Sequence, residues 1–371
     1  MAAVVLIMLF VLALFMPKSK ILYYAMMVCM WVLFVFNTGA PDTVIYEWIY
    51  NDNVPGAFEP LFTVIMSICR FGHFPFIGFR MVVATLLLVF INLTFRKVEN
   101  YKTLALAIYL IEPFPWQVSG MRAALACTIL MYAMSLLIED PKDNTLRYCF
   151  WVLMATMVHY SSILFIVMLL VRRQATVKTI FTYIAIAIIG VLIVSYSDVL
   201  LDFVSRFTQR EKIITWLSGG ANKEGYPNIK GFIAELIILF GNIFLTWRSK
   251  LVVTKHDSEN AISHVARAIY SLNVITILFI PLLRLNDTYM RLLFVMHGVN
   301  IIGYVMAAYV LQEHGKIEKR LQWITIPRLR FSIFVLIVPL WTYVIALYQN
   351  LPYFGTDRSV IKFLGEISLF H

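Results

Sequence analysis

Charged side chains are scarce in this chain of 371 residues, since Asp, Glu, Lys and Arg together make up only 14% of it. Hydrophobic residues make up 61%, well above the roughly 45–50% that soluble domains contain. Long apolar runs recur, such as 180–194 and 331–347, whereas strands of a membrane β-barrel alternate apolar and polar residues over about 10 positions. The composition therefore predicts an all-α, polytopic integral membrane protein.

Cysteine is also rare in the chain. The four that occur are Cys29, Cys69, Cys127 and Cys149. All lie in or beside apolar segments and lack the spacing of a metal site, which argues against disulfides and zinc and assigns the thiols to packing. No internal repeat, low-complexity tract or linker divides the chain, and no P-loop pattern occurs. We therefore expect a single transmembrane domain over residues 1–371.

The formal net charge is +10, and the basic residues gather in short connections between apolar runs. Because Lys and Arg favour the cytoplasmic side of a membrane, this charge indicates topology, and we expect no nucleic-acid partner. We place six basic connections in the cytoplasm: Lys18–Lys20, Arg96–Lys102, Lys142–Arg147, Arg172–Lys178, Arg248–Lys255 and Lys316–Arg330.

About twelve transmembrane helices fit between these connections, with both termini outside. Their expected bounds are 2–16, 21–37, 76–95, 102–117, 119–138, 147–159, 160–171, 178–196, 231–247, 260–283, 291–311 and 330–349. The first run has no basic residue before it and no small-residue cleavage site after it. We therefore take it as a membrane helix and not as a removable signal peptide.

The segment 147–171 would put its two basic flanks on opposite sides of the membrane if it were one span. The chain must therefore turn near His159–Ser162. The two halves, of roughly 12 residues each against the ~20 needed to cross, should meet below the outer surface in a thinned or hydrated region. By the same argument the apolar stretch 59–71 is re-entrant or interfacial. The fold thus combines full spans with short, broken helices near the outer face.

An arginine between two apolar runs marks the candidate site. Arg122 would cost roughly 2.5–3.5 kcal/mol at bilayer depth unless it is paired or hydrated, so its position indicates a function. Just before it, Glu112, Pro113 and Gln117 interrupt the apolar pattern and add polar groups. We expect Arg122 to bind an anion and Glu112 and Gln117 to contact the same substrate.

The expected outer loop 38–58 is acidic and contains no Lys or Arg. Asp42, Tyr46 and Tyr50 are spaced four residues apart, which would align them on one face of a short helix. A carboxylate beside aromatic rings suits a sugar, so we predict substrate contacts from Tyr46 and Tyr50. The other interpretation is an interfacial aromatic belt.

The long outer loop 197–230 has amphipathic spacing over Val199–Trp216, which predicts a helix lying at the membrane surface. Arg210, within that helix, would contact either the substrate or lipid headgroups.

A third outer stretch would place Arg284, Asp287 and Arg291 on one helical face, where the carboxylate could orient two guanidiniums. The two parallel N–H donors of a guanidinium match two oxygens of a diphosphate. A diphosphate at the depth of the lipid headgroups is most naturally that of a polyprenyl-diphosphate lipid. We therefore predict that Arg284 and Arg291 bind the diphosphate together with Arg122. An internal ion-pair network would explain the same spacing.

Three residues expected on the same side could take the proton from an attacking sugar hydroxyl: His159, Asp42 and Glu59. The sequence leaves the choice among them open. Considered alone, His159 is also compatible with a packing or capping role, but its place at a forced chain turn favours a functional one.

At these positions the chain resembles the EpsG-like branch of the Wzy-type polysaccharide polymerases. The resembling marks are Asp42-x-x-x-Tyr46-x-x-x-Tyr50, Glu59-Pro60, Arg122 followed by Ala123-Ala-Leu-Ala126, His159-Tyr-Ser161 and the stretch Arg284–Arg291. They occur in the family's order over about residues 42–291. The family typically has Gln where this chain has Ala123, and either Arg284 or Arg291 could be the late arginine.

The resemblance implies a glycosyltransferase that joins lipid-linked oligosaccharide repeat units on the outer face of the bacterial cytoplasmic membrane, for exopolysaccharide, capsule or O-antigen. The growing chain on undecaprenyl diphosphate would be the donor and a new repeat unit the acceptor, with a chain-length regulator as a further partner. Arginines would neutralise the leaving diphosphate in place of a metal, so we expect no cofactor.

Other function classes make different demands on the sequence. A lipid-linked oligosaccharide flippase would need polar groups through the depth of the membrane, whereas we expect them to cluster at the outer side. An O-antigen ligase would share the donor and the arginines. A membrane O-acyltransferase would need its histidine on the cytoplasmic side, and a structural scaffold would leave the buried arginines unexplained.

Overall fold

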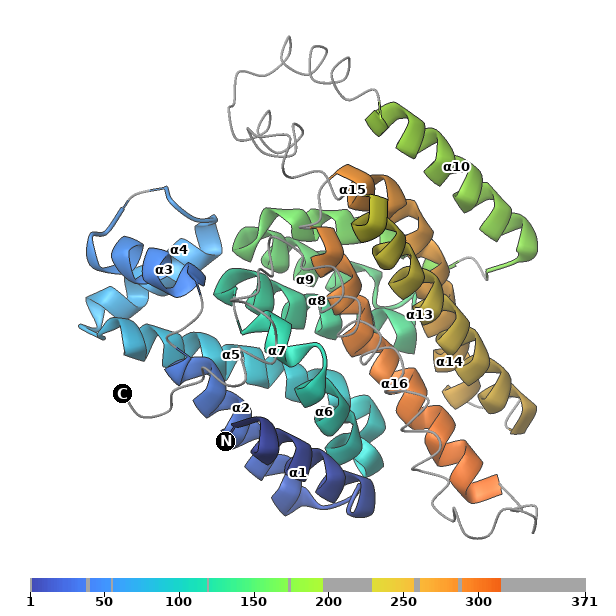
Figure 1. Cartoon of the computed structure of the whole chain (residues 1–371), viewed down its shortest axis with the longest axis horizontal. Helices are drawn as coiled ribbons and strands as arrows, with labels where there is room; N and C mark the ends of the chain where they lie inside the picture. The colour runs from blue at the N-terminus through green and yellow to red at the C-terminus, as the bar shows by residue number, and fades with distance from the viewer. Residues whose placement is uncertain are drawn as a thin grey trace.

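The computed structural model describes residues 2–37, 41–54, 56–118, 120–172, 175–195, 229–256, 261–285 and 289–314. Every regular element within these ranges is an α-helix or, where labelled η, a 3-10 helix (Figure 1). In chain order they are α1 (Ala2–Phe15), α2 (Lys20–Phe36), α3 (Pro41–Asn51), α4 (Pro60–Phe71), α5 (Phe76–Phe95), η1 (Arg96–Tyr101), α6 (Lys102–Ile111), α7 (Phe114–Gln117), α8 (Met121–Glu139), α9 (Thr145–Val158), η2 (Tyr160–Arg172), α10 (Val177–Ser195), α13 (Ile229–His256), α14 (Ala261–Ile275), η4 (Thr276–Phe279), α15 (Ile280–Leu285) and α16 (Met290–His314).

Six helical segments in the described part are long and apolar enough to cross a membrane, judged by length and composition. They are Phe76–Ile111, Met121–Glu139, Val177–Val194, Gly231–Lys255, Ile262–Leu285 and Arg291–Val310. Shorter apolar helices of 10–17 residues accompany them, among them α2, α4 and α9. The protein is therefore a helical membrane protein, as the composition predicted.

Most predicted bounds lie within one to three residues of an observed helix, but three do not. The expected span 102–117 stops at Ile111, because Pro113 has no N–H to continue the helix. The basic stretch Arg248–Lys255, predicted as a connection, is instead part of α13. The expected span 260–283 is divided into α14, η4 and α15. The predicted span 330–349 and the loop 197–230 with its surface helix lie outside the described residues.

The chain turn predicted near His159 is confirmed. α9 ends at Val158, His159 has an extended backbone (φ −154°, ψ 115°), and η2 begins at the next residue. The two helices lie antiparallel, and the Tyr148 hydroxyl donates a 2.6 Å hydrogen bond to the Phe165 carbonyl. A 3-10 helix rises about 2.0 Å per residue against 1.5 Å in an α-helix, so η2 reaches roughly 26 Å.

Contacts between distant residues show which helix ends lie together. Tyr101, just before α6, packs on Tyr309 near the end of α16 at 5.3 Å between ring centroids. At the other end of α6, Glu112 contacts His297 in the first half of α16. The two helices are therefore antiparallel.

The direction of α8 follows from its last residue. Glu139 forms an ion pair with Lys97 in η1, close to the end of α16. α8 therefore runs parallel to α16, and the two helices start at the same end of the bundle. We call this end, which carries Arg122, the Arg122 end.

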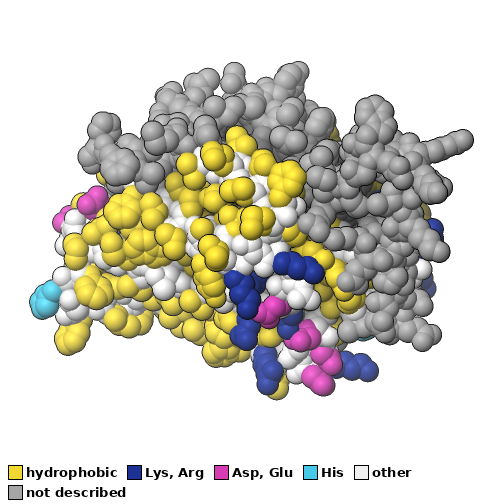
Figure 2. All heavy atoms as spheres, turned by 90° about the horizontal axis from the view of Figure 1, so that it is seen from below, with side chains coloured by type: hydrophobic (Ala, Val, Ile, Leu, Met, Phe, Trp, Pro, Cys, Tyr) yellow, Lys and Arg dark blue, Asp and Glu magenta, His cyan; other side chains and the backbone are white. Residues whose placement is uncertain are grey.

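Apolar side chains cover much of the outside of the bundle. On α10, which lies at the edge of the bundle in Figure 1, Phe181, Ile189 and Leu192 are among many exposed side chains. Figure 2 shows a face on which most of the visible charged side chains gather in one patch, while hydrophobic side chains cover much of the rest of the described surface. Such a surface fits a lipid environment.

The interior contains more polar residues than the sequence led us to expect. Glu235, Asn242 and Ser249 follow one another at intervals of seven on α13, and all three are buried. α13 packs against α14 and α16, which bury further polar side chains such as Asn273 and Asn300. The expectation that polar groups cluster at the outer side is therefore wrong for the described helices, because polar residues line helix contacts along the length of α13.

Candidate active site

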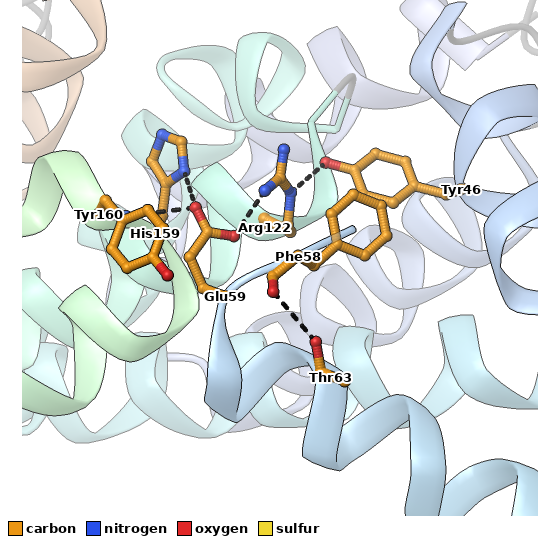
Figure 3. A network of polar contacts seen from close by, with 7 residues as sticks. All are labelled: Tyr46, Phe58, Glu59, Thr63, Arg122, His159 and Tyr160. Atoms are coloured by element: carbon orange, nitrogen blue, oxygen red, sulfur yellow. Dashed lines mark hydrogen bonds and ion pairs between the residues drawn. The ribbon is translucent and has the colours of Figure 1, made fainter. Parts of the chain in front are cut away.

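Arg122 lies in the first turn of α8 and binds residues from two other helical segments. Its Nη1 lies 2.5 Å from Glu59 Oε2, and its Nε donates a 3.1 Å hydrogen bond to the Tyr46 hydroxyl (Figure 3). The guanidinium carbon lies 4.4 Å from the centre of the Phe58 ring, a cation–π distance. A guanidinium has five N–H donors, so these contacts leave donors for an anionic ligand.

The partner carboxylate belongs to the residue that precedes α4. Pro60 opens the helix with the backbone angle that a first turn requires, and Glu59 makes no side-chain bond to its own helix. Instead, Oε1 of Glu59 accepts a 3.3 Å hydrogen bond from the backbone N–H of Tyr160 and lies 3.4 Å from His159 Nδ1. One carboxylate thus joins α4, α8 and the turn between α9 and η2 (Figure 3).

Burial would raise the pKa of the Glu59 carboxyl, but the contact with His159 and the charge of Arg122 outweigh it and lower the pKa to about 2. A carboxylate with so low a pKa stays ionised at neutral pH. It is also a weak proton acceptor, since a general base works best when its pKa lies near the operating pH. Glu59 is therefore better suited to hold Arg122 and His159 than to act as the base.

His159 sits on the extended residue that ends α9, where its side chain is partly exposed. When Nδ1 carries the proton directed at Glu59, the lone pair of the ring is on Nε2. A carboxylate placed in this way fixes the tautomer and the orientation of a histidine. The arrangement can therefore present Nε2 of His159 as a proton acceptor.

α3 brings two of its three predicted residues toward this cluster. Tyr46 binds Arg122, and a Cβ placed on Gly120, two residues before Arg122, would lie 3.9 Å from Asp42 Oδ2. Tyr50 lies apart from them: its hydroxyl donates a 2.7 Å hydrogen bond to the Phe74 carbonyl, and its ring packs in the core. A substrate contact from Tyr50 stays a prediction. We call Glu59, Arg122, His159, Tyr46 and Phe58 the Arg122 cluster.

The two late arginines lie near the Arg122 end but outside the Arg122 cluster. Arg291 is exposed in the first turn of α16, the helix whose start lies at that end. Arg284 is half-buried at the end of α15, with its guanidinium 5.9 Å from the centre of the Phe232 ring. Diphosphate binding by either arginine stays a prediction, and Asp287 and Arg210 lie outside the described residues.

The residues before Arg122 take part in a different set of contacts. Glu112 is buried and lies against His297, and Gln117 accepts a hydrogen bond from the Tyr109 hydroxyl. The Gln117 amide also donates a 2.9 Å hydrogen bond to Cys127 Sγ. Both predicted substrate residues are thus engaged with protein partners, and their contact with a substrate is untested.

Sequence reasoning missed three residues that matter for this arrangement. Phe58 directly precedes Glu59, and His297 is a histidine within a predicted span, so both carried a local signal. Arg80 lies in the apolar run of α5 and donates 2.6 Å hydrogen bonds to the carbonyls of Phe34 and Asn37 at the end of α2. A cation favours the carbonyls of a helix C-terminus, so Arg80 has a structural role.

Comparison with known proteins agrees with the resemblance found in the sequence. A family model described as the EpsG family matches residues 20–354, which include every residue of the Arg122 cluster. No curated protein and no solved structure matches the chain significantly. Because the match extends over most of the sequence, the chain belongs to the EpsG family.

Proposed function

We propose that this protein is a membrane glycosyltransferase that polymerises undecaprenyl-diphosphate-linked oligosaccharide repeat units into a surface polysaccharide. The observation that carries the proposal is the Arg122 cluster, in which one ionised carboxylate holds both a guanidinium and a histidine (Figure 3). Membership of the EpsG family supports the same class of reaction.

In the proposed reaction, Arg122 binds the diphosphate of the donor through the N–H groups that Glu59 and Tyr46 leave open. Arg291, and Arg284 behind it, would bind further phosphate oxygens from the same end of the bundle. As the bond between the anomeric carbon and the diphosphate oxygen breaks, negative charge grows on the diphosphate. Guanidiniums already in place stabilise that charge without a metal ion.

The acceptor needs a base because its attacking group is a sugar hydroxyl. We assign this role to Nε2 of His159, which takes the hydroxyl proton while the oxygen forms the new glycosidic bond. Glu59 orients the ring and stabilises the imidazolium that results. Asp42, which lies near Gly120 just before Arg122, would contact the sugar.

We further propose that the Arg122 end faces the outside of the bacterial cytoplasmic membrane and that the whole chain crosses about twelve times, with both termini outside. Cysteines placed at the exposed positions Asp52 and Lys255, in a background without the native cysteines, test this orientation. Asp52→Cys should react with a membrane-impermeant thiol reagent in intact cells and Lys255→Cys should not. Labelling of position 255 from outside would overturn the orientation.

The polymerase reaction is tested with purified protein in lipid nanodiscs and a synthetic lipid-diphosphate repeat unit. We expect a ladder of products from the wild type and a loss on the order of 10²–10³ in rate for Arg122→Ala. Arg122→Lys should be nearly as inactive, because lysine keeps the charge and loses the paired donors. Rescue by Lys at normal stability would instead favour a structural ion pair, and full activity of Arg122→Ala would end the proposal.

A lipid-linked oligosaccharide transporter is a second candidate, favoured by the buried polar residues along α13, α14 and α16. Vesicles containing the protein and a fluorescent lipid-diphosphate oligosaccharide separate the two functions. Exchange of the lipid between leaflets without a product ladder would support transport. Transfer of the glycan to a lipid A core acceptor, without any ladder, would support an O-antigen ligase.

A further inference from the structure

A second pair of a carboxylate and a histidine lies deeper in the bundle than the Arg122 cluster. Glu112 Oε1 lies 2.8 Å from His297 Nδ1, and the two side chains are 1% and 7% exposed. Ionisable groups inside a membrane protein are costly unless they are paired, and their presence favours a specific role. The pair joins the end of α6 to α16.

Glu112 is linked to Arg122 by a short stretch of chain. α6 ends at Ile111, directly before Glu112, and the eight residues after Glu112 lead through α7 to the start of α8. Gln117, in α7, binds Tyr109 of α6 and Cys127 of α8, so the three helices are tied to one another. We call this unit, residues 102–139, the Arg122 hairpin.

The Arg122 hairpin contacts two separate parts of the protein. The N-terminal part of the chain holds it through Glu59 and Tyr46, which bind Arg122. On the α16 side, Glu112 binds His297, and the adjacent Gly298 lets the Met131 side chain approach so closely that a Cβ there would collide with it. Arg291 lies six residues before His297, about 9 Å along the axis of α16.

We propose that Glu112 and His297 are positioning residues that set the distance between Arg122 and Arg291. The pair fixes the Arg122 hairpin against α16, so the two guanidiniums present themselves to one diphosphate at a constant separation. The identity of that anion rests on the proposed function. The positioning itself does not, because it concerns the geometry of two helices.

Spin labels at Ala123→Cys and Arg291→Cys measure the separation directly, in a background that lacks Cys29, Cys69 and Cys149 and keeps the buried Cys127 that Gln117 binds. Glu112→Ala should shift or broaden the distance distribution, because the hairpin loses its polar contact with α16. Glu112→Gln should restore the distribution, since the amide oxygen can still accept the His297 Nδ1–H. An unchanged distribution in Glu112→Ala would overturn the positioning role.

Asn300→Ala is the matched control. It removes a buried polar pair with Asn273, joined by hydrogen bonds of 2.6 and 3.0 Å, one turn further along the same helix. That pair connects α16 to α14 and not to the Arg122 hairpin. Its loss should lower the melting temperature and leave the label distance unchanged. Equal shifts in both variants would show that the Glu112 pair only stabilises the fold.

Activity provides the second measurement. Glu112→Ala should raise the KM for the lipid-diphosphate donor on the order of 10- to 100-fold, with a smaller effect on kcat, and Glu112→Gln should restore it. The protein could show no polymerase activity while Glu112→Ala still changes the label distance. That result would refute the proposed function and leave the positioning role intact. An active polymerase in which Glu112→Ala changes neither the label distance nor the donor KM would refute the positioning role alone.

Discussion

The two carboxylate–histidine pairs of this bundle contain the same chemical groups in different surroundings. In the Arg122 cluster, His159 is 22% and Arg122 is 25% exposed, so a ligand can reach both. In the deeper pair, Glu112 and His297 are almost completely buried against each other. A histidine beside a carboxylate can act as a base only where its second nitrogen reaches the substrate. Where the pair is buried away from the substrate, it can instead fix the relative position of the helices that it joins.

Replacing each histidine in turn should give the largest difference in kinetics between the two pairs. His159→Ala should lower kcat by about 10²–10⁴, the usual loss for a general base, because no group then accepts the acceptor proton. His297→Ala should leave kcat much closer to that of the wild type and act on the donor KM. Single-turnover rates at saturating donor measure the difference. If both variants lose kcat equally, the assignment of the base to His159 is wrong.

The ionised state of Glu59 can be tested by the pH dependence of stability. Its pKa in the folded protein, about 2, lies below the ordinary value of 4.5, so ionisation stabilises the fold above about pH 4.5. The contribution, about 3 kcal/mol at 1.36 kcal/mol per pH unit, should be lost as the pH falls from 4.5 toward 2. We therefore expect the stability gap between the wild type and Glu59→Gln to be constant from pH 8 to 5 and to shrink below pH 4.5.

The control for this measurement is Glu99→Gln, at an exposed carboxylate paired with Lys102 at 3.5 Å. An exposed pair contributes little, so the gap between this variant and the wild type should stay small at every pH. A gap for Glu59→Gln that persists unchanged to pH 3 would contradict the assignment of an ionised, paired Glu59.

The smallest expected effect concerns Tyr46. It tests which tyrosine of α3 contributes to donor binding. Tyr46→Phe removes the acceptor of the Arg122 Nε–H and keeps the ring, which should cost about 1 kcal/mol in donor binding. Tyr50→Phe is the matched control, because it removes the hydrogen bond to the Phe74 carbonyl in the core. It should lower the melting temperature without changing the donor KM. A larger loss of activity from Tyr50→Phe would place the substrate further along α3.

Much of the architecture follows from the sequence alone. Apolar runs of about 20 residues predict membrane helices because every backbone group in lipid must be bonded within its own segment. The placement of basic residues required a turn at His159, and the structure has it there. The spacing of Asp42, Tyr46 and Tyr50 predicted a short helix, which is α3. Asp42 and Tyr46 lie near Arg122 as expected, whereas Tyr50 binds the Phe74 carbonyl. These features depend on the local hydrophobic pattern and on charge, and residues close together in the sequence determine both.

The partners of the buried charges were decided by the tertiary structure. Glu59 and Arg122 are 63 residues apart, and Glu112 and His297 are 185 apart. Proximity in sequence suggested that Glu112 would serve the same substrate as Arg122, which stays untested, and its contact with His297 of α16 had no counterpart in the sequence pattern. A helix pattern fixes which face of a segment is apolar, but not which neighbour it meets. That choice depends on how all the helices fill space together, and it determined which carboxylate holds Arg122.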